Sequence, residues 1–266
     1  MSDSAADPAF VDGQGRPRLA RSAFLYVDLL GVRDVSATSP AEGLRRLDHA
    51  IRRAFRDFLA ADSPWPSAFF SDTLVVASPF VEPDLEEAAL GGLIIQAASL
   101  QLELVEDDWF LRGGLALNDV HVRDGLVFGP ALIDAYDVER RQAVHPRIVL
   151  SAAAVESQRK ALDDYGEPTE SPENGLLLQD TDGLVFIDYL SLVFDEVDPH
   201  PVLLMHRDRV ISRLERHRSN PRVWEKYRWV AEYHNHTCRL RLPGDDALLV
   251  PDTARSLSFS PFVAGD

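Results

Sequence analysis

The stretch FFSDTLVV, residues 69–76, decides how the first part of this chain folds. Apolar residues stand on both sides of a polar pair, Ser71-Asp72, a pattern typical of two short strands joined by a tight turn. Core-facing strands rarely carry an ionised aspartate, because desolvating an unpaired charge is costly or shifts its pKa. We therefore predict a hairpin within residues 67–80, with Asp72 at its tip.

A second aspartate interrupts an apolar run upstream, in SAFLYVDLLGV, residues 22–32. The run is typical of a buried strand, and no turn requires an acidic residue at Asp28. Asp72 alone is an ordinary turn former, but neighbouring strands would bring both carboxylates to one edge of a sheet. Adjacent carboxylates repel each other unless they share a cation, so the pair predicts a divalent metal. Mg²⁺ or Mn²⁺ carrying a phosphate suits such hard oxygen ligands.

The hydrophobic pattern around this pair alternates between strands and helices. Outside the two strand regions already described, it predicts helices over 39–62, 82–108, 129–144, 201–218 and 222–236, a strand over 145–151, and hairpins over 109–129 and 176–190. This order predicts an α+β sandwich, in which helices cover a mostly antiparallel central sheet. We expect a mobile N-terminal tail (1–20), a main domain (21–198), a C-terminal helical extension (199–242) and a final tail (243–266).

The composition limits the classes of partner and compartment. The 266 residues include 27 basic and 43 acidic side chains, giving a net charge of −16, which argues against DNA, RNA or anionic membranes as partners. The apolar run 88–105 is interrupted by polar residues, and we expect it to be too polar to span a bilayer. A single cysteine, Cys238, and an N-terminus without a signal-peptide layout indicate a cytoplasmic protein.

Zinc is the weaker alternative for a metal site. His234, His236 and Cys238 lie close together in the sequence, but no second ligand cluster stands at a zinc-finger spacing. These residues are therefore more typical of the polar end of a helix than of a zinc site.

Several segments within residues 22–151 resemble the class III nucleotidyl cyclase domain, in that family's order: FLYVDLLGV, FFSDTLVVAS, LRGGLAL and FGPALIDAYDVERRQAVHPRIVLS. The resemblance implies a cyclase-like fold in which Asp28, Leu29 and Asp72 hold two Mg²⁺ or Mn²⁺ ions on a nucleoside triphosphate. It also implies that Arg112 contacts phosphate. The backbone N–H groups that would point at the triphosphate belong to Leu29, Leu30, Gly31 and Val32.

The chain departs from the purine cyclases of this family at the positions that read the base. Ala68 stands where those enzymes carry a base-reading lysine, and Leu126 stands near their second polar reader. Adenine's polar edge would therefore be left unpaired in a pocket lined by Ala68, which discriminates against ATP. Ile133 and Asp137 occupy the positions of the family's transition-state Asn and Arg.

One bacterial branch resembles this chain more closely, through FGPAL…AY..E…PRIV and the later EKYRWVAEYHN. These are the pyrimidine cyclases of the Pycsar anti-phage defence system. The resemblance implies that the protein converts UTP to cyclic UMP and pyrophosphate, and that a separate effector senses the product. Cytidylate cyclase activity on CTP is the runner-up, because no residue could be matched to the edge that distinguishes uracil from cytosine.

Other groups must then stabilise charge at the α-phosphate. Tyr136, Arg140 and Arg141 lie within one helical turn of the vacated positions. We take Arg141 as the catalytic candidate, with Arg140 as its alternative, and Tyr136 as a substrate contact; a solvated helix face is the other reading of the two arginines. The family builds its site between protomers, which implies a head-to-tail homodimer. A catalytically silent, nucleotide- or partner-binding domain is the alternative: the missing Asn and Arg favour it, and the retained aspartate pair argues against it.

Overall fold

The computed structural model describes residues 8–59, 63, 65–164, 171, 173–251 and 257–263. The strands are β1 (Ala20–Leu29), β2 (Ser67–Phe70), β3 (Thr73–Pro79), β4 (Leu111–Arg123), β5 (Leu126–Phe128), β6 (Ile148–Leu150), β7 (Leu177–Gln179), β8 (Val185–Ile187) and β9 (Ser260–Pro261). The α-helices are α1 (Val32–Thr38), α2 (Pro40–Ala54), α3 (Arg56–Leu59), α4 (Glu86–Glu106), α5 (Pro130–Arg141), α6 (Ala152–Asp164), α7 (His200–Arg216) and α8 (Pro221–Arg241).

The strands form one mixed sheet in the order β2-β3-β1-β4-β6-β8-β7-β9, and β5 pairs with β4 outside this path. The β4–β6 pair is parallel, and the other pairs are antiparallel. The three predicted hairpins are present as β2–β3, β4–β5 and β7–β8. The predicted α+β class, with a mostly antiparallel sheet covered by helices, is therefore confirmed.

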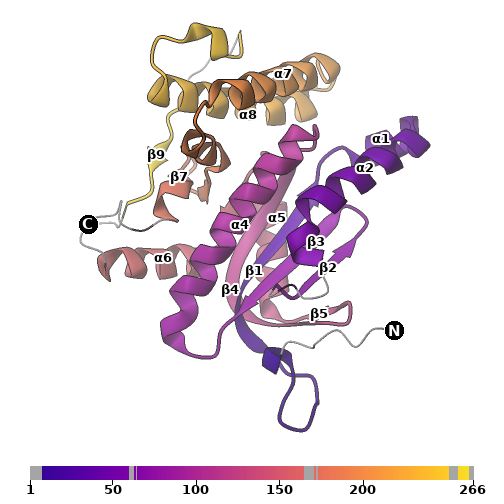
Figure 1. Ribbon diagram of the computed structural model, residues 1–266, viewed down its shortest axis with the longest axis vertical. Helices are drawn as coiled ribbons and strands as arrows, with labels where there is room; N and C mark the ends of the chain where they lie inside the picture. Colours follow the sequence, from indigo (N-terminus) through magenta and orange to yellow (C-terminus); the bar gives the residue numbers. More distant parts are fainter. Residues whose placement is uncertain are drawn as a thin grey trace.

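Helices cover both faces of the sheet, with α4 on one side and α5 on the other (Figure 1). Alternation along β1 sends Leu25 and Val27 into the large core that includes α4, and Phe24 into a smaller core that includes α5. Asp28, two residues after Tyr26, lies on the α5 face by the same alternation. The sheet thus presents its first predicted metal ligand beside α5.

Helix α4 is more apolar than we expected from its polar interruptions. The most apolar 18-residue window of the span Pro83–Glu106 has a mean hydropathy of 1.5, so the helix could cross a membrane by length and composition alone, contrary to the prediction that it is too polar. In the fold, 56% of its most apolar window is buried, and Leu90, Leu93 and Ile94 are fully buried. Its apolar surface is explained by packing against the sheet.

Several boundaries differ from the sequence prediction. The strand over 22–32 ends at Leu29, because Gly31 adopts a left-handed φ of 91° and α1 begins directly after it. The helix over 39–62 divides into α2 and α3 near Phe55, and residues 60–62 lie outside the described part.

Both expected tails contribute to the packed structure where they are described. Phe10, within the expected N-terminal tail, is fully buried in the smaller core. Near the other end, β9 pairs with β7, and the flanking Phe259 and Phe262 are buried. The C-terminal helical extension shares the large core with the sheet through residues such as Val210 and Val230.

Gly114 allows α5 to lie unusually close to β4. A Cβ atom at this position would stand 2.1 Å from the carbonyl oxygen of Ala135 and 2.9 Å from Cβ of Val138. We expect Gly114→Ala to lower the free energy of unfolding by about 1–3 kcal/mol, because α5 must move away from the strand. Gly175→Ala is the matched control, since its Cβ would meet nothing within 4 Å. Urea denaturation measures both variants, and equal losses would contradict this explanation.

Candidate active site

The structure brings Asp28 and Asp72 to the same end of two paired strands. β1 and β3 run antiparallel with Asp28 opposite Thr73, and the Leu29 N–H donates to the Asp72 carbonyl oxygen at 2.8 Å. Asp72 lies in the turn between β2 and β3, next to Ser71, whose φ of 60° closes this turn. The strand pairing that the sequence required for a shared site is therefore present.

The two carboxylates influence each other electrostatically. The Asp28 side chain is 23% exposed, and its pKa is raised mainly by burial and further by the charge of Asp72, whereas Arg112 acts in the opposite direction. Such a pair suits a hard divalent cation, because Mg²⁺ takes one or two protein carboxylates and completes its shell with phosphate and water. Among the described residues no group of three or more His, Cys, Asp or Glu side chains could hold a metal. Asp28 and Asp72 fit the narrower role, in which the substrate supplies the other ligands.

Arg112 is held between two carboxylates in this structure. It lies directly opposite Asp28 on β4, and its Nε is 3.5 Å from Asp28 Oδ2 and 2.6 Å from Glu139 Oε1. The Glu139 side chain is only 4% exposed, and burial raises its pKa. We did not predict Glu139, although a signal existed: Ala131, Ala135 and Glu139 stand four residues apart and so share the buried face of α5.

A lysine from the C-terminal helices completes this charged cluster. Lys226, on α8, is half-buried and interacts electrostatically with Arg112, Asp28 and Glu139. Burial lowers its pKa first of all, and the charges of Arg112 and Arg222 lower it further. The sequence around Lys226 did not predict this location, because α8 and β1 lie near opposite ends of the chain.

The backbone after Asp28 is only partly free to bind phosphate. The Leu29 N–H bonds the Asp72 carbonyl and the Leu30 N–H bonds the Phe110 carbonyl, both at 2.8 Å. The prediction that these two N–H groups point at a triphosphate is therefore wrong, because the sheet uses them. Gly31 and Val32 begin α1, where helical N–H groups have no acceptor within the helix, so they stay candidates. The role of Leu29 as a metal ligand stays a prediction.

The α5 candidates have different surroundings. Tyr136 packs edge-on against Tyr26 at 5.7 Å between ring centroids, and Arg140 donates to the Tyr136 hydroxyl at 3.1 Å. This places both near the β1 strand that carries Asp28. Arg141 is 73% exposed and pairs with Asp137 at 3.5 Å along the same helix. The structure does not bring Arg141 to Asp28 within one chain, and its catalytic role stays a prediction about a dimer.

Three of the four positions that depart from the purine cyclases carry no polar side chain, and the fourth is Asp137. Ala68 on β2 is half-buried against the smaller core. Leu126 on β5 is 56% exposed and Ile133 on α5 is 59% exposed. The surfaces at which a purine reader or transition-state Asn would stand are therefore apolar.

The residues considered for zinc have other partners. His234 is buried, and its Nε2 lies 2.9 Å from the Leu248 carbonyl oxygen and 3.5 Å from Cys238 Sγ. His236 packs edge-on against Phe259 at 5.1 Å between centroids. These contacts connect α8 to the segments that follow it.

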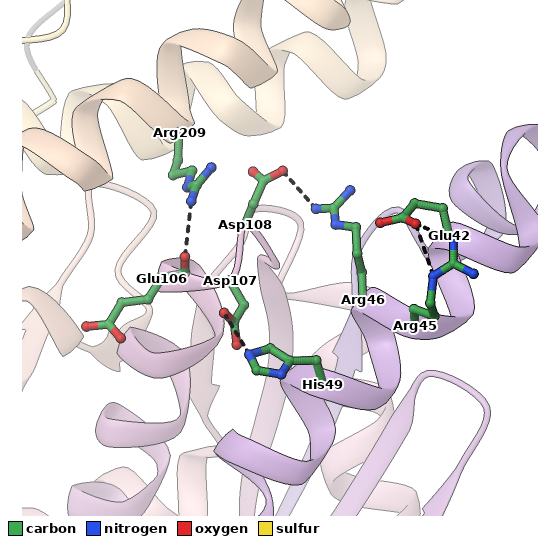
Figure 2. A pocket seen from close by; sticks show the side chains of 8 residues that line it. All are labelled: Glu42, Arg45, Arg46, His49, Glu106, Asp107, Asp108 and Arg209. Atoms are coloured by element: carbon green, nitrogen blue, oxygen red, sulfur yellow. Dashed lines mark hydrogen bonds and ion pairs between the residues drawn. The ribbon is translucent and has the colours of Figure 1, made fainter.

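A separate pocket of about 530 Å³ lies between α2, the end of α4 and α7, as Figure 2 shows. Its lining residues are Glu42, Arg45, Arg46, His49, Glu106, Asp107, Asp108 and Arg209. Many of these charges pair with one another: Arg46 reaches Asp108 at 3.2 Å, and Arg209 donates to the Glu106 carbonyl at 3.3 Å. The pocket contains neither Asp28 nor Asp72, and its paired charges connect α2 and α7 to the end of α4.

No known family model matches this chain, and no curated protein matches it in sequence. Among solved structures, it is similar to the adenylyl cyclase CyaB from P. aeruginosa, at 11% identity and a TM-score of 0.48, over 64% of this chain and 94% of that one. It is also similar to the guanylate cyclase domain of RhGC from Catenaria anguillulae in complex with GTP, at 14% identity and a TM-score of 0.45, over 63% and 96%. These values are too low to assign a function, so any assignment depends on the site residues.

Proposed function

We propose that this protein is a class III-type nucleotidyl cyclase that converts UTP to 3′,5′-cyclic UMP and pyrophosphate. The observation that carries the proposal is that Asp28 and Asp72 lie at the same end of adjacent strands, close enough for the charge of Asp72 to raise the pKa of Asp28. The sequence resemblance over residues 22–151 supports it, because the same two residues match that family's metal ligands.

The reaction requires the ribose 3′-oxygen to bond the α-phosphorus while the bond from that phosphorus to the pyrophosphate oxygen breaks. Two Mg²⁺ or Mn²⁺ ions would supply the positive charge that eases loss of the 3′-hydroxyl proton and neutralises the leaving pyrophosphate. Asp28 and Asp72 would hold those ions, with the Leu29 carbonyl as a further ligand. Tyr136 and Arg141 would contact the substrate from a second protomer.

Arg112 is suited to bind phosphate once the site is filled. Its guanidinium is now shared by Asp28 and Glu139. When Asp28 binds metal, its charge is no longer available to Arg112, and a phosphate oxygen becomes the better partner. Glu139 would keep the guanidinium in place during this exchange.

The apolar residues at Ala68 and Leu126 support a pyrimidine rather than a purine substrate. Neither side chain can hydrogen-bond the polar edge of adenine or guanine, so a buried purine would lose partners that water gives it. CTP is the alternative substrate, with the same chemistry. As the Pycsar resemblance implies, cyclic UMP would act in the cytoplasm as a signal that a separate effector detects after phage infection.

A head-to-tail homodimer is part of this proposal. Large apolar side chains are exposed on elements that border the aspartate pair: Phe70, at the end of β2, is 83% exposed, and Ile133 on α5 is 59% exposed. Covering such side chains with a second copy would remove apolar surface from water. It would also bring the α5 residues of one protomer toward the aspartates of the other.

Product analysis tests the activity directly. Purified protein is incubated with Mn²⁺ and each of the four NTPs, and the products are identified by mass spectrometry. We expect cyclic UMP and pyrophosphate, and their loss in Asp72→Asn. Asp124→Asn is the matched control, since Asp124 also lies in a hairpin turn, between β4 and β5. Folded, dimeric protein that forms no cyclic product from any NTP would favour the silent-domain alternative instead.

A further inference from the structure

Lys226 is exceptional among the basic residues of this chain. Of the 27 basic side chains, Lys160 and Lys226 are the lysines and the rest are arginines. Lys160, on α6, is 74% exposed and pairs with Glu156 at 3.6 Å. Lys226 is half-buried, and no ion pair within 4.0 Å among the described residues uses its ammonium group. A partly desolvated ammonium without a close counter-ion is available for an anion.

The position of Lys226 is fixed by strong contacts along α8. Trp229, three residues later and on the same side of the helix, donates from Nε1 to Asp180 Oδ2 at 2.8 Å. Its ring stacks on His145, with 5.4 Å between centroids and 4° between planes. Tyr227 packs edge-on against Phe110, just before β4, at 5.3 Å. Helix α8 is therefore held against the start of the strand that carries Arg112.

The charges that face Lys226 come from several elements. They are Asp28 on β1, Arg112 on β4, Glu139 on α5 and Arg222 on α8 itself. Arg112 already lies within ion-pair distance of both carboxylates. A cation bound at Asp28 and Asp72 would neutralise the negative charge of the Asp28 carboxylate. The positive charges of Arg112 and Lys226 would then be in excess. The highly charged triphosphate of a nucleotide is the anion that would balance it.

We propose that Lys226 binds the triphosphate of the substrate, beside Arg112 and within its own chain, so that the C-terminal helix α8 forms part of the active site. This inference rests on the proposed function. It gives the C-terminal helices a direct role in substrate binding.

Lysine footprinting tests the contact without measuring turnover. The protein is treated with an amine-acetylating reagent, with and without Mn²⁺ and 3′-deoxy-UTP, which lacks the attacking hydroxyl. Mass spectrometry then follows acetylation at the two lysines. We expect bound 3′-deoxy-UTP to slow modification of Lys226 by about tenfold and to leave Lys160 unchanged, because an engaged ammonium is not a nucleophile. Equal rates at Lys226 in the free and bound protein would overturn the inference.

Substitution separates substrate binding from a structural role. In Lys226→Met we expect the Kd for 3′-deoxy-UTP to rise by about ten- to a hundredfold, as for loss of a charged hydrogen bond, while Lys226→Arg recovers part of the affinity. The Kd for Mn²⁺ alone should stay the same or fall, because a nearby positive charge is removed. Lys160→Met is the control for both measurements. Weaker Mn²⁺ binding with unchanged nucleotide binding would contradict the proposal.

The two proposals fail in different ways. If the wild-type protein forms no cyclic product and does not bind 3′-deoxy-UTP, the cyclase assignment is wrong and the role of Lys226 falls with it. If the wild type forms product and Lys226→Met binds and turns over UTP as the wild type does, only the role of Lys226 is wrong. Should Lys226→Met fail to fold, the footprint on the wild-type protein still decides.

Discussion

Asp28→Asn is expected to reduce cyclic nucleotide formation by about 10³-fold or more. Each tenfold in rate corresponds to about 1.4 kcal/mol, and charge stabilisation by a bound metal contributes several kcal/mol to such a transition state. The amide keeps the size of the side chain but lacks the charge that holds the cation. Mn²⁺ binding, followed by electron paramagnetic resonance, should weaken in parallel, which shows that the loss arises at the metal site.

The Asp28 result needs a control for aspartates elsewhere on the sheet. Asp119→Asn, at an exposed position on β4, should leave activity and Mn²⁺ binding unchanged. The double variant Asp28→Asn/Asp72→Asn should be no less active than either single variant, because residues that act as a unit are strongly non-additive. If the activity losses of the two single variants multiply in the double variant, the two carboxylates do not share a cation. Normal Mn²⁺ binding in Asp28→Asn would show the same.

The aspartate pair could be predicted from the sequence because both residues break a local pattern. Asp28 and Asp72 each interrupt an apolar run, and the hairpin pattern fixed where Asp72 turns the chain. The sequence did not predict which N–H groups the sheet would use after Asp28. Leu29 and Leu30 bond to Asp72 and Phe110, and this follows only from knowing which strands are neighbours.

The remaining members of the charged cluster depend on tertiary packing. Glu139 in the sequence is one of several charges on a helix, and it becomes buried because Gly114 lets α5 lie against β4. Lys226 reaches the cluster because Trp229 fixes α8 far along the chain from Asp28. Helical and strand periods predict which face of an element is buried, but they do not tell which remote element covers it.

The anchor of α8 gives the second large prediction. Arg147 is 1% exposed and forms an ion pair with Asp180, whose side chain is 4% exposed, and also with Asp182. We expect Arg147→Met to lower the free energy of unfolding by about 3–5 kcal/mol, because it leaves Asp180 buried without its counter-charge. Arg45→Met is the control: Arg45 pairs with Glu42 at 2.6 Å, but at 70% exposure, so its loss should cost less than about 1 kcal/mol. Urea denaturation measures both.

A second substitution identifies the cause of that loss. Asp180→Asn in the Arg147→Met background removes the stranded charge while its amide oxygen can still accept from Trp229 Nε1, so we expect part of the stability to return. If the double variant is as unstable as Arg147→Met, packing of the arginine over Trp229 and Phe186 matters more than the buried charge.

Because the same contacts position α8, Lys226 should also be acetylated faster in Arg147→Met than in the wild type. An unchanged rate would show that α8 reaches the site without this anchor.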